Sequence, residues 1–132
     1  MTRYITLIIM FLALCQINYA QSITVTSPTT GDIYQGCNTY NITWTDSGTS
    51  EFYSIDYSVD NGSTWTSIAT FYNTSSGFYS WEVPNIQSTS ALVRVQDSNN
   101  ALVEGTSANF SMIAPLILVS PIGGESWEGG TT

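Results

Sequence analysis

The sequence of 132 residues contains no histidine and no lysine, and its only two basic residues are Arg3 and Arg94. The chain therefore lacks the groups used in histidine acid–base catalysis, in Ser-His and Cys-His nucleophile systems, in Schiff-base chemistry and in P-loop phosphate binding. Two basic residues also cannot neutralise a phosphate backbone, which excludes nucleic acid as a partner. We predict that the protein is not an enzyme.

Cysteine is scarce as well, because the chain has only Cys15 and Cys37. Cys15 lies in an apolar N-terminal segment, which leaves Cys37 alone in the body of the chain. A single thiol forms neither an internal disulfide nor a thiolate metal cluster. We expect Cys37 to be a small, half-buried residue just before a strand.

Residues 1–20 are typical of a signal peptide, and we exclude them from the fold. Arg3 supplies the basic start, residues 5–14 form the apolar stretch, and Asn-Tyr-Ala ends the segment as a cleavage site. The apolar run is about half of the roughly 20 residues that cross a bilayer, so a permanent anchor is the weaker interpretation. A lipoprotein attached through Cys15 is another alternative, although Leu14 stands where a small residue is expected. The segment predicts a secreted or cell-surface protein with no membrane span after cleavage.

Apolar and aromatic residues are abundant by contrast. The chain is 42% hydrophobic and only 9% charged, and it contains 4 Trp, 8 Tyr and 5 Phe. This composition can form a core and is not that of a disordered tail. The formal net charge of -8 predicts a surface that repels polyanions.

The end of the sequence repeats its beginning. Residues 116–129 match residues 23–36, and a serine, a proline and two glycines recur at a constant offset of 93: Ser27, Pro28, Gly31 and Gly36 with Ser120, Pro121, Gly124 and Gly129. Repetition at domain length indicates tandem modules. We therefore predict one complete module over 22–114 and the start of a second, truncated repeat over 115–132. The chain is then expected to be a fragment of a longer protein or the translation of a truncated gene model.

Hydrophobic residues within the module alternate with a period of two, in short segments separated by Gly, Asn, Asp, Ser and Pro. This pattern predicts an all-β, immunoglobulin- or fibronectin-III-like two-sheet sandwich of about seven strands. The expected strands are residues 23–26, 40–45, 52–59, 65–71, 77–83, 91–97 and 107–113.

The same alternation predicts which side chains form the core, with Trp44 and Trp81 at its centre. The expected core residues are Tyr40, Ile42, Trp44, Tyr53, Ile55, Tyr57, Val59, Tyr79, Trp81, Val83, Ala91, Val93 and Val95.

Residues 58–65 match the S-x-D-x-G-x-T-W pattern of the Asp box, which is known from sialidase propellers and other secreted β proteins. We interpret the box as a structural turn formed by Ser58, Asp60, Gly62 and Trp65. An Asn-Gly pair ending at Gly62 supplies positive φ for a tight hairpin, the Asp60 carboxylate accepts backbone N–H bonds, and Trp65 is expected to return its ring to the core. A sialidase also needs several arginines, and Arg94 is the only one in the module.

The acidic residues do not form a recognisable site. Asp56 and Asp60 are four apart on an expected strand, about 13 Å from each other, too far for a glycosidase pair, and we expect both to be solvated. Calcium at a loop that carries Asp46, Glu51 or Asp97 stays an open alternative because hard oxygen ligands are abundant, but no EF-hand spacing occurs. Our prediction therefore includes no metal and no cofactor.

Four aromatic residues are expected to face away from the core: Phe52, Phe78, Phe71 and Tyr72. Such rings stack on sugars or seat a partner domain, and they are our candidates for carbohydrate or partner contact. Asn41, Asn61, Asn73 and Asn109 begin N-x-S/T sequons, which are glycan acceptors in a eukaryotic secretory pathway.

The order of these motifs resembles the Ser/Thr-rich, immunoglobulin-like module of the yeast cell-wall beta-1,6-glucan synthesis family, in the form of its N-terminal domain. Bacterial relatives of that module occur as tandem repeats in secreted and surface proteins. The resemblance covers residues 23–113 and rests on S-P-x-x-G-D/E-x-Y/W-x-G, N-I-T-W at 41–44, the segment 55–62, W-E-V-P at 81–84, L-V-R-V at 92–95 and N-F-S at 109–111. The resemblance implies an extracellular, non-catalytic module involved in cell-wall or surface organisation, and the family offers no established catalytic residues to carry over.

The leading functional hypothesis is a non-catalytic β-sandwich repeat module of a secreted or cell-surface multidomain protein. Such a module acts in cell-wall or surface organisation, in adhesion or as a spacer. Its expected partners are neighbouring modules of the same chain and cell-wall or extracellular polysaccharide. The alternative is a carbohydrate-binding module attached to a polysaccharide-degrading enzyme.

Overall fold

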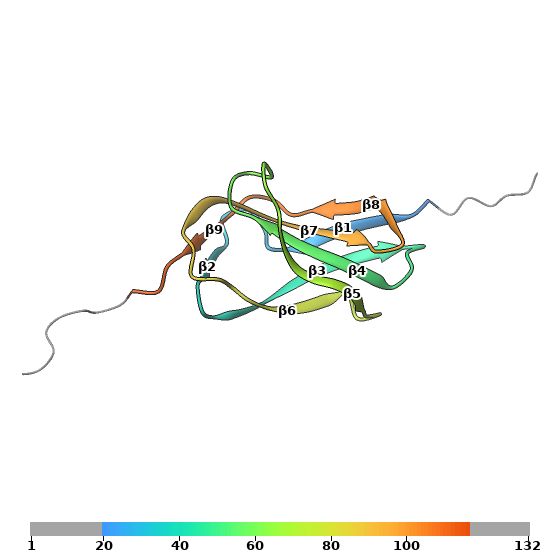
Figure 1. The fold of residues 1–132 in the computed structure, drawn as a ribbon, viewed down its shortest axis with the longest axis horizontal. Coiled ribbons are helices and arrows are strands. Elements are labelled where there is room, and N and C mark those ends of the chain that lie inside the picture. Colours follow the sequence, from blue (N-terminus) through green and yellow to red (C-terminus); the bar gives the residue numbers. More distant parts are fainter. Residues whose placement is uncertain (1–19, 117–132) are drawn as a thin grey trace, which may run out of the picture.

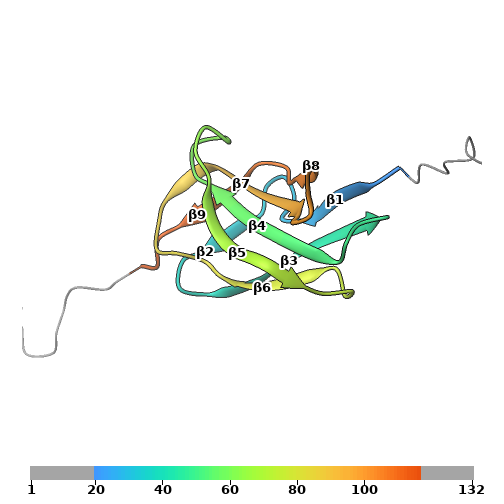
Figure 2. The same ribbon diagram turned by 45° about the vertical axis from the view of Figure 1, so that its right-hand side comes forward.

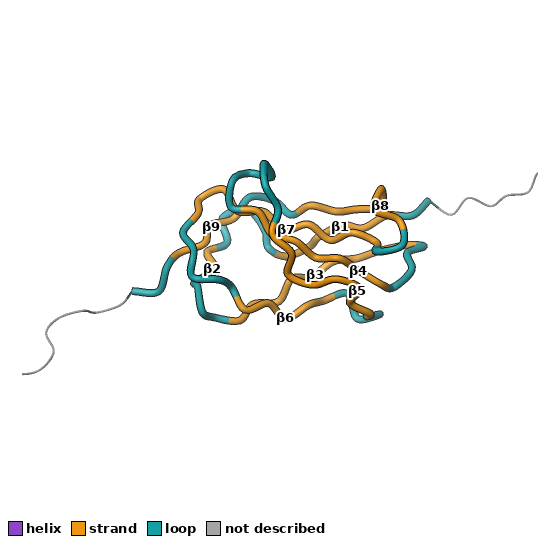
Figure 3. Tube along the Cα trace, viewed as in Figure 1, coloured by secondary structure: helices purple, strands orange, loops and turns teal. Residues whose placement is uncertain are grey.

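The computed structural model describes residues 20–116, and within this range the chain forms nine β-strands and no helix (Figures 1 and 3). Accordingly, no helix there is long and apolar enough to cross a membrane. The predicted signal peptide and second repeat lie almost entirely outside the described residues. The strands are β1 (Ser22–Ser27), β2 (Ile33–Gln35), β3 (Thr39–Ser47), β4 (Phe52–Ser58), β5 (Thr66–Asn73), β6 (Phe78–Glu82), β7 (Ser88–Asp97), β8 (Asn100–Thr106) and β9 (Phe110–Ile113).

The strands form two sheets packed face to face (Figure 2). The smaller sheet has the order β1-β3-β6, and the larger has the order β2-β9-β7-β4-β5 with β8 also beside β7. Strand β7 is central, because it pairs with β4 along one edge and with β8 and β9 along the other. The predicted all-β immunoglobulin-like sandwich is confirmed, with nine strands in place of about seven.

The two strands that the sequence did not predict are β2 and β8. Strand β2 is only three residues long and lies in a turn-rich segment, where alternation gives almost no signal. It arises because the chain crosses from the smaller to the larger sheet after β1, so that β1 pairs with β3 while β2 pairs in parallel with β9. Strand β8 contains Gly105 and begins with Asn100, residue types that favour turns, yet it forms a ladder with β7.

The core lies between the two sheets, as the alternation predicts. Of the thirteen expected core residues, nine are buried, and the other four, Tyr40, Tyr57, Val59 and Tyr79, are partly buried against them. The predicted register is therefore right on all four strands. The other buried hydrophobic residues of the core come from β1, β2 and β9: Ile23, Tyr34, Phe110 and Met112.

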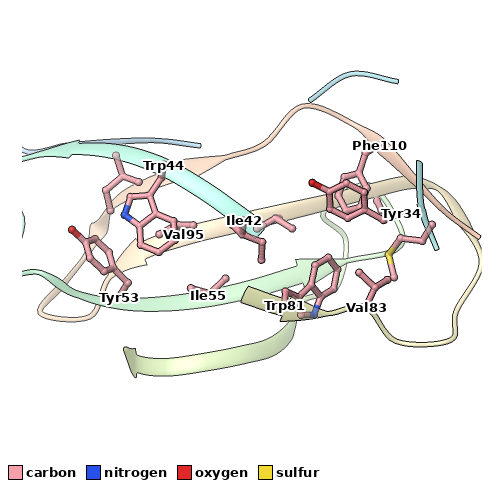
Figure 4. Close-up of a cluster of buried hydrophobic side chains, with 13 residues drawn as sticks. Tyr34, Ile42, Trp44, Tyr53, Ile55, Trp81, Val83, Val95 and Phe110 are labelled. Atoms are coloured by element: carbon pink, nitrogen blue, oxygen red, sulfur yellow. The ribbon is translucent and has the colours of Figure 1, made fainter. Parts of the chain in front are cut away.

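Aromatic rings fill both ends of this core (Figure 4). At one end Trp44 meets Tyr53 edge-on, with 5.0 Å between the ring centroids. At the other end Tyr34 stacks on Tyr40 at 4.1 Å and lies 5.1 Å from Phe110. Aromatic pairs in these geometries add to the stabilisation from apolar burial, which helps this core to be stable without a disulfide bond.

One side of the sandwich is closed by contact between β1 and β8. A side chain at Gly105 would place its Cβ 2.6 Å from the carbonyl oxygen of Ile23, so only glycine permits this approach. The contact is extended by a hydrogen bond of 3.0 Å from Asn100 Nδ2 to Gln21 Oε1. The opposite side, between β5 and β6, is the open one.

The segment that recurs at the end of the sequence forms β1, a turn and β2. Gly31 has φ +88°, a conformation that other residues rarely adopt, and a Cβ at Gly36 would lie 2.9 Å from the Cα of Asn85. Asp32 Oδ2 accepts a hydrogen bond of 2.7 Å from the backbone N–H three residues before it. Tyr34 is buried. Gly31 and Gly36, which recur as Gly124 and Gly129, thus each have a backbone role in the first copy.

Candidate functional site

The Asp-box residues form the hairpin between β4 and β5. Asn61 has φ 56° and Gly62 has φ 85°, as a tight hairpin turn requires. The hydroxyl of buried Ser58 donates to Asp60 Oδ1 at 2.7 Å and accepts from the Gly62 N–H at 2.8 Å. Asp60 accepts two further bonds from Thr64, from its N–H at 2.8 Å and its hydroxyl at 2.7 Å. The carboxylate and both hydroxyls are used within the turn, which is the arrangement of a structural hairpin.

Trp65 lies outside the core, contrary to the expectation that its ring returns to the interior. Strand β5 begins one residue later, and the half-buried Trp65 ring instead packs under Arg94, whose guanidinium carbon is 4.3 Å from the ring centroid. Arg94 also pairs with Asp56 at 2.8 Å and lies 3.9 Å from Glu104. Asp56, expected to be solvated, is thus ion-paired. The only arginine of the module is occupied by its own neighbours.

The hydrogen bonds around Asp60 hold the pKa of its carboxyl at about 2, with the Thr64 hydroxyl as the largest cause. Because this pKa is lowered, the stabilisation of the hairpin is fully present above the ordinary value of 3.8 and is lost as the pH falls toward about 2. We expect Thr64→Ala to raise the pKa of Asp60 toward its ordinary value, as measured by NMR titration of the carboxyl carbon. Ser63→Ala is the control, since Ser63 contributes only its backbone N–H to the turn. An unchanged Asp60 pKa in Thr64→Ala would contradict this account.

The three acids considered for calcium do not converge. Asp97 is buried and accepts hydrogen bonds of 2.9 Å from the N–H groups of Ser50 and Asn99, so it fastens two loops. Asp46 and Glu51 are exposed. Among residues 20–116 no group of three or more acidic, histidine or cysteine side chains is placed to hold a metal ion.

The outward aromatic residues do not share one surface. Phe52, Phe71 and Phe78 are exposed, at 39%, 66% and 41%. Phe52 alternates with core residues of the larger sheet and Phe78 with core residues of the smaller sheet, so these two rings point away from opposite faces of the sandwich. Tyr72, expected to face outward, is half-buried and packs edge-on against Tyr79 with 4.9 Å between the ring centroids.

A groove of about 310 Å³ opens on the side of the sandwich between β5 of the larger sheet and β6 of the smaller sheet. Figures 1 and 2 both show these two strands next to each other. Tyr57 from the larger sheet and Trp81 from the smaller sheet approach within 5.4 Å between ring centroids. The groove is lined by Tyr57, Thr66, Ser67, Ile68, Tyr79, Trp81, Glu82 and Pro84.

The polar groups of this groove differ from those of the core in their hydrogen bonding. In the core the hydroxyl of Tyr34 pairs with Ser27 at 3.0 Å, and that of Tyr40 accepts from a backbone N–H at 3.0 Å. Around the groove, five polar groups have no hydrogen-bond partner among residues 20–116: the hydroxyls of Tyr57, Thr66 and Tyr79, the Glu82 carboxylate and the Trp81 indole N–H. The groove therefore offers aromatic surface together with unused donors and acceptors.

Sequence reasoning missed this groove because its two walls belong to different sheets. Tyr57, Tyr79 and Trp81 were assigned correctly to the core side, but alternation does not tell which core-facing residues reach the rim of a sandwich. The one available signal is the small residue Thr66 at the start of β5, since it lies opposite Tyr57 and leaves space beside large rings.

Cys37 and the sequon asparagines lie on the surface. Cys37 is exposed and not half-buried as expected, because it occupies a turn with φ 63° ahead of β3. Asn41, Asn61, Asn73 and Asn109 are all exposed as well. Their side chains are accessible, and Asn61 is part of the Asp-box turn.

Comparison with known protein families, with curated proteins and with solved structures finds no match for this chain. The resemblance to the beta-1,6-glucan synthesis family therefore stays a prediction that rests on the motifs quoted above. The surface features that bear on function are the hairpin, the separate phenylalanines and the groove.

Proposed function

We propose that this chain is a non-catalytic extracellular β-sandwich module of a secreted or cell-surface multidomain protein. It acts in cell-wall or surface organisation, in adhesion or as a spacer. The observation that carries the proposal is the repeat of residues 23–36 at 116–129, since recurrence at domain length is typical of tandem modules. The N-terminal segment supports an extracellular location.

The chemistry of the described side chains supports a non-catalytic role. Arg94 is engaged by Asp56 and by the Trp65 ring, and Asp97 is engaged by loop N–H groups. Asp60 serves the hairpin turn. These groups stabilise the fold, and none of them pairs with a histidine or lysine, because the chain has neither.

The test is export of the full chain, carrying a C-terminal epitope, from a yeast and from a Gram-negative bacterium. We expect export of a protein whose new N-terminus is Gln21, identified by mass spectrometry. Leu7→Arg, which interrupts the apolar stretch, should keep the chain inside the cell. Retention of the unaltered chain with Met1 intact in both hosts would overturn the proposal. So would release of reducing ends from polysaccharide by the purified protein above a heat-denatured control.

The alternative of a carbohydrate-binding module needs a surface for the sugar. Phe52 and Phe78 face away from opposite sheets, so they do not support a shared stacking platform. Tyr72 is half-buried and packs edge-on against Tyr79, so it does not stand on the outer face with either phenylalanine. A sugar contact is better supported at another place in the fold.

A further inference from the structure

We propose that the groove between β5 and β6 binds an uncharged saccharide chain. This inference rests on the extracellular role proposed above, because a surface module meets polysaccharide outside the cell. It names a site that the outward phenylalanines do not provide.

The shape of the groove suits a small portion of a chain. Its volume of about 310 Å³ is at the lower end of the range for ligand pockets. The groove runs along two edge strands and lies on the open side of the sandwich, whereas β1 and β8 close the other side. A chain can therefore pass through it with only a few sugar units in contact.

The chemistry of the lining matches sugar rings, which have apolar faces and a rim of hydroxyl groups. Tyr57 and Tyr79, both half-buried, supply aromatic surface for the faces, whereas Trp81 is only 4% exposed and contributes its indole N–H. Their hydroxyls and indole N–H, with the Glu82 carboxylate, supply donors and acceptors for the rim. Figure 4 shows the indole nitrogen of Trp81 on the side of its ring away from Ile42.

The unpaired polar groups of the groove differ from a buried unpaired group elsewhere in the protein, because they are accessible to solvent. The indole N–H of Trp44 is buried without a hydrogen-bond partner, whereas the indole N–H of Trp81 is not fully buried. Ligand hydroxyls can therefore replace the water that solvates the Trp81 N–H and the tyrosine hydroxyls.

The charge of the site selects against anionic ligands. Glu82 is the only charged residue in the lining, and the whole chain has a formal net charge of -8. An anionic polysaccharide is repelled by both. A carboxylate beside aromatic rings instead accepts hydrogen bonds from neutral sugar hydroxyls.

The competing hypothesis is that a peptide adds as a further strand to the edge of β5 or β6. The edge of β5 is poorly suited to such an addition. The register of β5 against β4 shifts at two places, and Phe71 within β5 has φ 51°. Such irregularities interrupt the row of N–H and C=O groups that a new strand needs. Strand β6 offers only five residues.

The experiment is a two-dimensional NMR titration of the isotopically labelled full chain with neutral gluco-, manno- and xylo-oligosaccharides at millimolar concentration. We expect at least one of them to shift the Trp81 indole N–H and the amides of residues 66–68 and 79–82. The Trp44 indole N–H should not move. Absence of any shift with all three, or shifts confined to residues around Phe52 or Phe78, would overturn the groove assignment.

Two matched variants locate the binding. Thr66→Tyr, at the position opposite core-side Tyr57, fills the groove and should abolish the shifts, whereas Ser80→Tyr places the same ring at an exposed position on the outer face of β6 and should leave them. Glu82→Gln and Tyr79→Phe keep the side-chain volume and should each weaken binding about threefold to tenfold, the effect of one lost hydrogen bond. Equal binding by Thr66→Tyr and the unaltered chain would overturn the proposal.

A titration with a peptide distinguishes strand addition from saccharide binding. Amide shifts along the outer edge of β5 with an extended Thr/Val-rich peptide, in the absence of any saccharide shift, would assign the edge to strand addition instead. All these measurements use purified protein, so they do not depend on where the chain resides. A failure to bind sugars leaves the extracellular proposal standing, and failed export leaves a positive titration standing.

Discussion

Replacement of Trp44 by alanine is expected to lower the free energy of unfolding by about 3–5 kcal/mol, because it removes a large buried ring and leaves a cavity. Trp44 is 3% exposed, and its ring meets Tyr53 edge-on at one end of the core. A loss of this size is comparable to the whole stability of a typical domain. Urea unfolding followed by circular dichroism measures the change, and the variant should be largely unfolded or poorly secreted.

The matched control is Phe52→Ala, at the same end of the sandwich but on the outer face of β4. It should cost much less than Trp44→Ala, since Phe52 is already 39% exposed. Trp44→Phe should also cost much less, because it keeps a ring against Tyr53 and removes an indole N–H that is buried without a partner. Equal losses for Trp44→Ala and Phe52→Ala would mean that the strand register differs by one residue.

Replacement of Asp97 by alanine is expected to lower the free energy of unfolding by about 2–4 kcal/mol, because it leaves buried hydrogen-bond donors without an acceptor. Asp97 is 1% exposed, and its carboxylate accepts from the N–H groups of Ser50 and Asn99. It thereby joins the loop before β4 to the turn after β7. Asp97→Asn keeps one acceptor oxygen in place and should lose less than Asp97→Ala.

The same carboxylate makes stability depend on pH. Burial alone raises the pKa of Asp97, but the hydrogen bonds from Ser50, Asn99 and Asn100 outweigh burial, so its pKa lies below the ordinary value of 3.8. The stabilisation is therefore present above the ordinary pKa and is lost as the pH falls through the lowered one. Urea unfolding at a series of acidic pH values should show this loss, and it should be smaller in Asp97→Asn. An identical decline in both proteins would assign the acid sensitivity to other carboxyls.

Alternation along the strands was enough to predict the sandwich and the core rows, because a buried face leaves a period-two pattern. Ile42, Trp44 and Val95 could be placed from parity alone. Parity fails where a strand is very short, as in β2, or where turn-forming residues occupy a ladder, as in β8. Strand order is set by tertiary packing, which explains why the change of sheet between β1 and β2 was not predicted.

The surface was less predictable than the core. Parity correctly indicated that Phe52 and Phe78 are exposed, but it does not tell which sheet a strand joins, and only strand order places the two rings on opposite faces. Trp65 was expected in the core because of its motif, but its ring packs against the guanidinium group of Arg94 on the outer face. The groove depends on which edges of two sheets meet, and this information is not local in the sequence.

The parallel pairing of β2 with β9 has a mechanical consequence. The described chain enters and leaves at opposite ends of the sandwich (Figure 1). Once β1 has detached from β3, tension applied to those ends pulls the parallel neighbours β2 and β9 along their length in opposite directions. The bonds from Gly36 N–H to Ile113 O at 2.8 Å and from Ser111 N–H to Asp32 O at 2.9 Å then bear the load together. Rupture requires several bonds to break at once, and a module built this way resists stretching more strongly than one whose terminal strands peel apart one bond at a time.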